Sequence, residues 1–171
     1  MIQFFLSKVT VSILSLLLIA VAIGYFLYFD QAAYDTQAKE IANFVASRID
    51  EIASENMQMK VLFVYNDSQG VQLPAKVGDQ YYTLEIGTRA IVIRLEGKNT
   101  FGYASYIHRS IYTFNPSILK GKKVTSEMLE HYQLSHTPLY SHTQAFYVEQ
   151  KYMLVDGLWT YVTFVYLKNA K

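Results

Sequence analysis

The sequence contains no cysteine, and this absence removes a whole group of chemistries. Disulfide bonds, thiolate metal sites and cysteine nucleophiles are all excluded, whatever the redox state of the compartment. If the chain works outside the cell, packing alone must stabilise its folded state.

The sequence also lacks an excess of either charge, because 15 Lys and Arg residues stand against 14 Asp and Glu residues, a net charge of +1. Such a balance of charges produces no long-range electrostatic field that would attract a nucleic acid or an acidic substrate. We therefore expect no nucleic-acid partner.

The motifs that carry catalysis are missing as well. The sequence has no glycine-rich phosphate loop and no Gly-x-Ser-x-Gly elbow. His131, His136 and His142 follow one another at spacings of five and six residues, whereas the paired histidines of a zinc-protease helix are about four apart. These histidines are expected to lie in surface loops. The sequence thus predicts no enzyme, no catalytic residue, no metal site and no cofactor.

What the sequence does contain is one long apolar stretch, Val9–Phe29, without a charged residue. As a helix its roughly 21 residues would rise about 31 Å, which matches the apolar thickness of a bilayer. A buried core helix is one alternative, but soluble chains of this size rarely bury a helix that is apolar on every face. A cleavable signal peptide is another, but its apolar region usually has only about 7 to 15 residues. We expect a retained span, whose core-facing or lipid-facing side chains are Val9, Ile13, Leu16, Leu17, Ile19, Val21, Ile23, Phe26 and Phe29.

The charges on either side of this stretch indicate its orientation. Lys8 precedes it, and every acidic residue lies at Asp30 or later. Because positive charge beside a first helix tends to stay in the cytoplasm, the residues after Asp30 are expected to be extracellular. No other stretch approaches about 18 apolar residues, so one crossing is expected.

The helical pattern continues past Asp30 to about residue 56 without a proline or glycine. Residues 1–56 are therefore expected to form one helix, apolar in its first half and amphipathic in its second. A coiled-coil stalk is the alternative for the second half. The apolar stripe that we expect to pack on the following domain consists of Tyr34, Ala38, Ile41, Val45, Ile49 and Ile52.

Residues 57–171 change to the alternation typical of strands and are expected to form one β-rich extracellular domain. Asp156-Gly157 between two alternating runs is the strongest hairpin signal in the chain. A short helix is expected to begin at Thr125 or Ser126 and to end at about His131. Six or more strands after one long helix predict an α+β fold with an antiparallel sheet or sandwich.

Two surface features invite a functional interpretation. Asn66-Asp67-Ser68 meets the acceptor rule for N-glycosylation in an expected turn, which makes Asn66 a candidate site. Lys120, Lys122 and Lys123 could contact anionic lipid or a partner, but lipid-binding patches usually carry about four to eight charges. A solvated loop is the preferred interpretation of the lysines.

The layout resembles that of the class III type IV pilin-like proteins of archaea. An apolar N-terminal helix that continues into an amphipathic one precedes a small β-rich domain without cysteine, and the segment Val71–Ile86 resembles the Leu-Pro, Gly and Tyr pattern that follows the helix in several such families. The resemblance implies a filament subunit for surface adhesion, with apolar helices bundled in the core and β domains outward. Its partners would be copies of itself, the membrane before assembly, and other pilin-like or envelope proteins.

A single-pass membrane anchor is the alternative function. No pair of a basic residue and glycine precedes the apolar stretch, although archaeal prepilins usually carry one at their cleavage site. The chain is then either already processed or stays in the membrane uncleaved. In the second case it would be an envelope protein with an extracytoplasmic β domain, such as a filament stator, an envelope-binding protein or a sensor module.

Overall fold

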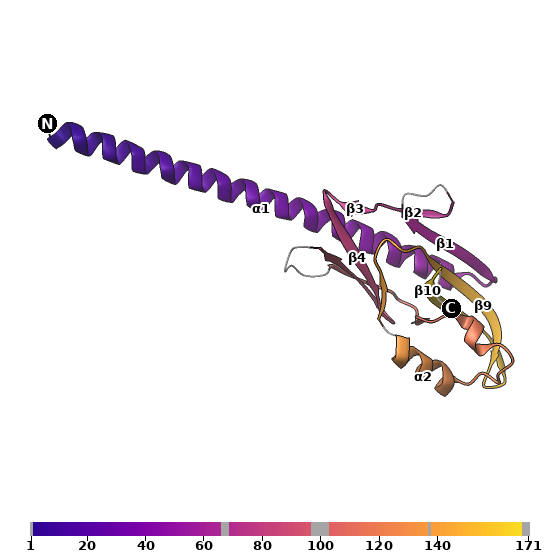
Figure 1. Ribbon diagram of the computed structural model, residues 1–171. Coiled ribbons are helices and arrows are strands. Elements are labelled where there is room, and N and C mark those ends of the chain that lie inside the picture. Colours follow the sequence, from indigo (N-terminus) through magenta and orange to yellow (C-terminus); the bar gives the residue numbers. More distant parts are fainter. Residues whose placement is uncertain (1, 66–68, 97–102, 137, 169–171) are drawn as a thin grey trace. The chain divides into compact units, whose positions relative to one another are not determined.

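The computed structural model describes residues 2–65, 69–96, 103–136 and 138–168, with side chains from residue 10 onward apart from 103–106. The chain forms two compact units, Met1–Thr36 and Gln37–Lys171. Every described residue of the first unit is helical, whereas the second unit carries the strands (Figure 1).

The fold is α+β, a long helix followed by β-sheets, as the sequence predicts. In chain order the elements are α1 (Ile2–Ser54), β1 (Met59–Tyr65), β2 (Val71–Leu73), β3 (Lys76–Val77), β4 (Gln80–Ile86), β5 (Ala90–Leu95), β6 (Tyr103–Tyr106), β7 (Ile111–Tyr112), the 3-10 helix η1 (Pro116–Leu119), α2 (Ser126–His136), β8 (Leu139–Ser141), β9 (Phe146–Val155) and β10 (Leu158–Leu167).

α1 is a single helix of 53 residues. It contains no proline, the residue that would break it, and only one glycine, Gly24, in its apolar half. It ends at Ser54, close to the expected end at residue 56. In the second unit its buried side chains are small or β-branched: Ala38, Ala42, Val45, Ala46, Ile49, Ile52 and Ala53.

The first sheet has the strand order β2-β1-β9-β10-β7. Its centre is the β9–β10 hairpin, in which ten residue pairs run from Leu158 opposite Val155 to Leu167 opposite Phe146. The turn is Asp156-Gly157, as predicted, and both residues have positive φ, 51° and 83°. Aspartate and glycine tolerate this conformation best, which explains why the sequence signal was reliable here.

The sheet is mixed, whereas the sequence led us to expect antiparallel pairing. β2 runs parallel to β1, and β7 runs parallel to β10. β2 begins beside the middle of β1, with Val71 opposite Phe63. Gly70 makes this approach feasible, because a Cβ at this position would lie 2.4 Å from the Leu62 carbonyl oxygen and its φ is +116°.

The second sheet has the order β3-β4-β5-β6, and β8 pairs with the β4 strand outside that path. β4 and β5 form a hairpin closed by a hydrogen bond from the Gly87 N–H to the Ala90 carbonyl oxygen. Alternate side chains of the two strands form one apolar face, which consists of Tyr82, Leu84, Ile86, Ile91, Ile93 and Leu95. The sequence did not indicate β3 and β8, which have two and three residues.

Hydrogen bonds from the connections and strands of both sheets hold the second half of α1. On the side of the second sheet, the Gln37 amide oxygen accepts from the Gly78 N–H (3.0 Å), and the Asp50 carboxylate accepts from the N–H groups of His108 and Arg109. On the side of the first sheet, the Gln150 amide donates to the Glu55 carbonyl oxygen, just beyond the helix. The end of α1 is therefore part of the β-rich core.

η1 and α2 cover the other face of the first sheet. Leu119 of η1 and Leu129 of α2 share an apolar cluster with Phe164 on β10. α2 begins where the sequence predicts, with the Thr125 hydroxyl accepting from the Met128 N–H. It continues to His136 rather than ending near His131, because the buried Gln133 amide accepts from the Thr113 N–H and donates to the Thr113 hydroxyl.

Replacement of a core residue of α1 tests this arrangement. Ile49→Ala removes a fully buried side chain and should lower the free energy of unfolding by about 2–5 kcal/mol. Leu134→Ala, at a position 83% exposed, should change it by less than about 0.5 kcal/mol. Near-UV circular dichroism during denaturant unfolding in detergent measures both. Equal effects of the two substitutions would mean that α1 is not part of the core.

Candidate interaction surfaces

The apolar half of α1 is exposed on every face. Between Val11 and Phe29, each of the fourteen large apolar and aromatic side chains is at least 52% exposed. This set includes Ile13, Leu16, Leu17, Ile19, Val21, Ile23, Phe26 and Phe29; Val9 is in the helix, but its side chain is not described. The Ser15 hydroxyl donates to the Val11 carbonyl oxygen (2.9 Å), which satisfies this polar group within the helix. The helix is long and apolar enough to span a membrane.

The structure buries part of the apolar stripe expected to pack on the β domain. Ala38, Val45 and Ile49 are fully buried, Ile52 is nearly so, and Ile41 is half-buried. Tyr34 belongs to the first unit and is half-buried. Sequence reasoning missed a second row of buried positions, Ala42, Ala46 and Ala53. The recurrence of alanine every four residues at 38, 42 and 46 was the signal for it, since small side chains allow close approach on an added face.

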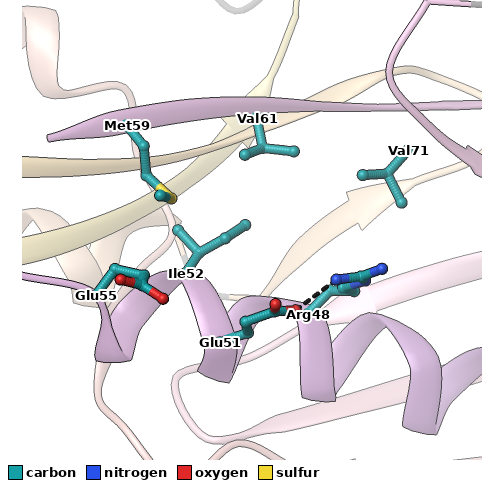
Figure 2. Close-up of a pocket in the computed structure, with 7 residues that line it drawn as sticks. All are labelled: Arg48, Glu51, Ile52, Glu55, Met59, Val61 and Val71. Carbon is teal, nitrogen blue, oxygen red and sulfur yellow. Dashed lines mark hydrogen bonds and ion pairs between the residues drawn. The ribbon is translucent and has the colours of Figure 1, made fainter. Parts of the chain in front are cut away.

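A groove opens between the end of α1 and strands β1 and β2, and we call it the α1–β1 groove (Figure 2). Its apolar floor consists of Ile52 from α1 together with Met59, Val61 and Val71 from the strands. Met59 and Val61 point toward Ile52 in the close-up. The groove holds about 300 Å³, enough for one or two side chains.

The rim of this groove is acidic. Glu51 and Glu55, one helical turn apart, line it together with Arg48. Arg48 forms an ion pair with Glu51 at 2.5 Å (Figure 2). Within the described part of the chain, the Glu55 carboxylate has no ion pair or hydrogen bond. The rim therefore has a net negative charge and one carboxylate that remains available.

A second apolar surface lies at the end of the β9–β10 hairpin. We call Tyr152, Leu154, Leu158 and Trp159 the hairpin tip; these side chains are 42%, 45%, 73% and 63% exposed. By the register, Tyr152, Leu154 and Trp159 share one face of the hairpin, and Leu158 lies on the other face, opposite Val155. The rings of Tyr152 and Trp159 are stacked, with their centroids 5.1 Å apart. Exposed apolar groups that lie together, as Tyr152, Leu154 and Trp159 do, mark interaction sites on protein surfaces.

The hairpin tip is held in place by two polar contacts. The Tyr161 hydroxyl donates to the Asn56 carbonyl oxygen (2.7 Å), which ties β10 to the end of α1. On the opposite side, the Asp156 carboxylate accepts from the hydroxyl and the backbone N–H of Ser126, the first residue of α2. These hydrogen bonds lower the pKa of the Asp156 carboxyl, and Lys123 lowers it further. A carboxylate at a helix N-terminus is also stabilised by the helix dipole.

The three lysines that the sequence singled out lie beside this tip. Lys120, Lys122 and Lys123 are exposed, and we call them the basic loop. Val124, the next residue, pairs with Val155 at the end of β9. Lys122 donates to the Tyr132 hydroxyl (2.8 Å), so it lies against α2. The structure thus places positive charge next to the exposed apolar tip, a juxtaposition that sequence reasoning did not anticipate.

The histidines occupy separate places. His136 contacts the Tyr132 carbonyl oxygen through Nδ1 and lies against Phe114, whereas His142 is 3.2 Å from Glu96. His131 and His136 are in α2 rather than in a loop. Among the described residues, no three His, Asp or Glu side chains come together as metal ligands. Asn66, the candidate glycosylation site, lies outside the described residues.

Two tyrosines connect the sheets, the half-buried Tyr65 and the buried Tyr82, and both are held protonated. Burial raises the pKa of Tyr65 to about 12, and it also raises the pKa of Tyr82. The Tyr82 hydroxyl donates to the Pro74 carbonyl oxygen, and the Tyr65 hydroxyl lies 3.1 Å from that of Ser141. Their environment suits hydrogen bonding and not proton transfer at neutral pH.

No protein-family model matches the chain, and no curated protein or solved structure is significantly similar to it. Function must therefore be inferred from the chemistry of the surfaces themselves.

The contact between Asp156 and Ser126 leads to a pH prediction. Because the folded-state pKa is lowered, this contact should stabilise the fold above the ordinary aspartate pKa of about 3.9 and lose its effect as the pH falls through the folded value. Ser126→Ala should raise the Asp156 pKa, as measured by NMR titration of its carboxyl carbon. Ser135→Ala, which removes a hydroxyl elsewhere on α2, should leave that titration unchanged. An Asp156 pKa that Ser126→Ala does not alter would refute the assigned cause.

Proposed function

We propose that the chain is a structural subunit of a pilin-like surface filament, inserted in the membrane through α1 before assembly. The observation that carries the proposal is the exposure of the apolar half of α1 on every face. Burial of such side chains stabilises by about 1.5–3 kcal/mol each, so fourteen of them represent on the order of 20–40 kcal/mol. Lipid, and after assembly other copies of the helix, would cover such a surface.

The continuity of α1 supports a subunit rather than a separately tethered domain. The helix that carries the exposed apolar residues also supplies Ala38, Val45 and Ile49 to the core of the second unit. Bundled apolar helices would therefore be joined to their β domains without an intervening linker. Small side chains and satisfied hydroxyls, such as Gly24 and Ser15, permit close contact between such helices.

Electron microscopy of material sheared from the cell surface tests this function. Filaments that contain this chain, and that persist without detergent, would support a pilin-like subunit. Recovery of the chain solely from detergent-extracted membranes, without filaments, would overturn the filament and leave a single-pass anchor with an extracytoplasmic β domain.

A charge placed in the middle of the apolar half of α1 should block insertion into the membrane, which precedes filament assembly. Leu17→Asp puts a carboxylate where it costs about 2.5–3.5 kcal/mol in a membrane-spanning helix, so the membrane-bound fraction and the filament count should both fall. Leu134→Asp, on the exposed side of α2, should change neither. Alkaline extraction of membranes measures the first quantity. Normal membrane retention of the Leu17→Asp chain would contradict a role for this helix in insertion.

A further inference from the structure

The α1–β1 groove and the hairpin tip are complementary in two independent ways. The groove has an apolar floor, and the tip exposes four apolar or aromatic side chains. The groove rim carries Glu51 and Glu55, and the basic loop lies beside the tip. Apolar contact supplies the attraction, and the opposite charges select the partner and its orientation.

The two surfaces are not joined within one copy, because no side chain of the hairpin tip lines the α1–β1 groove. Two hydrogen bonds hold the hairpin tip in its exposed position, one from Tyr161 to Asn56 and one from Ser126 to Asp156. The Asp156 carboxylate, the one acidic group in the hairpin turn, is therefore directed to the start of α2 and not to the tip's apolar side chains. The groove and the tip each remain open to a second molecule.

We propose that the hairpin tip of one copy docks into the α1–β1 groove of a second copy. This inference rests on the proposed function and names the contact between β domains within the filament. The two surfaces differ, so the contact is heterologous, and each added copy presents a free groove and a free tip to the next. A heterologous contact of this kind extends into a chain of subunits unless its rotation closes a ring.

The size of the groove sets the strength of the contact. A volume of about 300 Å³ accommodates one or two side chains, so we expect the contact to bury less than the roughly 1,200–2,000 Å² of a stable interface. Free copies should associate weakly. When lipid or helix bundling holds the second units close together, the effective concentration is high and the same contact should be populated.

Introduced cysteines test the contact, because the chain has none of its own. Full-length Val71→Cys chains, with the thiol at the groove, and Leu158→Cys chains, with the thiol at the tip, are co-expressed and oxidised in the cell envelope. We expect a disulfide-linked dimer when both chains are present, and a ladder when one chain carries both substitutions. Tyr140→Cys, an exposed position on β8, replaces Leu158→Cys as the control and should give no dimer with Val71→Cys.

A charge variant gives a second readout that does not depend on thiol geometry. With Val71→Cys and Leu158→Cys in place, Trp159→Glu adds a carboxylate to the tip and should lower the ladder yield roughly tenfold or more, since it would enter an apolar groove with an acidic rim. Leu134→Glu should leave the yield unchanged. In the same double-cysteine chain, Glu55→Lys with Lys120→Glu and Lys123→Glu should give more ladder than Glu55→Lys alone.

The outcomes separate this inference from the proposed function. Filaments seen by electron microscopy without the Val71–Leu158 cross-link would overturn the docking contact and leave the filament in place. The cross-link without filaments would support docking and overturn the filament. Absence of both would refute both.

Discussion

Close packing of the alanine-rich face of α1 against the strands is the interaction on which the second unit depends. Ala38, Ala42 and Ala46 are buried at steps of four, and a larger side chain at any of them would hold the sheets away from the helix. Hydrogen bonds then fix the helix from two directions, through Asp50 to the β6–β7 connection and through Gln150 on β9. The helix adds to the direct contacts between the two sheets, such as the one between the rings of Tyr65 and Tyr82.

The same helix meets two kinds of surroundings along its length. Up to Phe29 its side chains are exposed and apolar, whereas from Ala38 onward one side is enclosed by strands and the other carries charges. Propensity alone does not distinguish these halves, because both consist of good helix formers. What differs is the pattern of polarity, and this pattern determines which neighbours each half can accept.

Sequence reasoning succeeded where a local rule decides the structure. The Asp156-Gly157 turn requires positive φ at both residues, and the uninterrupted helical composition of α1 admits one interpretation. It failed where distant residues decide. β8 exists because Leu139–Ser141 pair with β4, and the α2 helix extends past His131 because Gln133 bonds to Thr113, twenty residues earlier. The α1–β1 groove and the proximity of Trp159 to the basic loop also arise from contacts between distant residues, so no local sequence pattern predicts them.

The outer strands of the first sheet are very short: β2 has three residues and β7 has two. An edge of this length offers a neighbour few unpaired backbone groups, which is how many natural sheets avoid templating β-pairing between molecules. At the β2 and β7 edges, copies crowded at a surface would thus have little opportunity to pair strand by strand. Association at these two edges would rely on side chains, and such contacts can form and separate repeatedly without loss of the native fold.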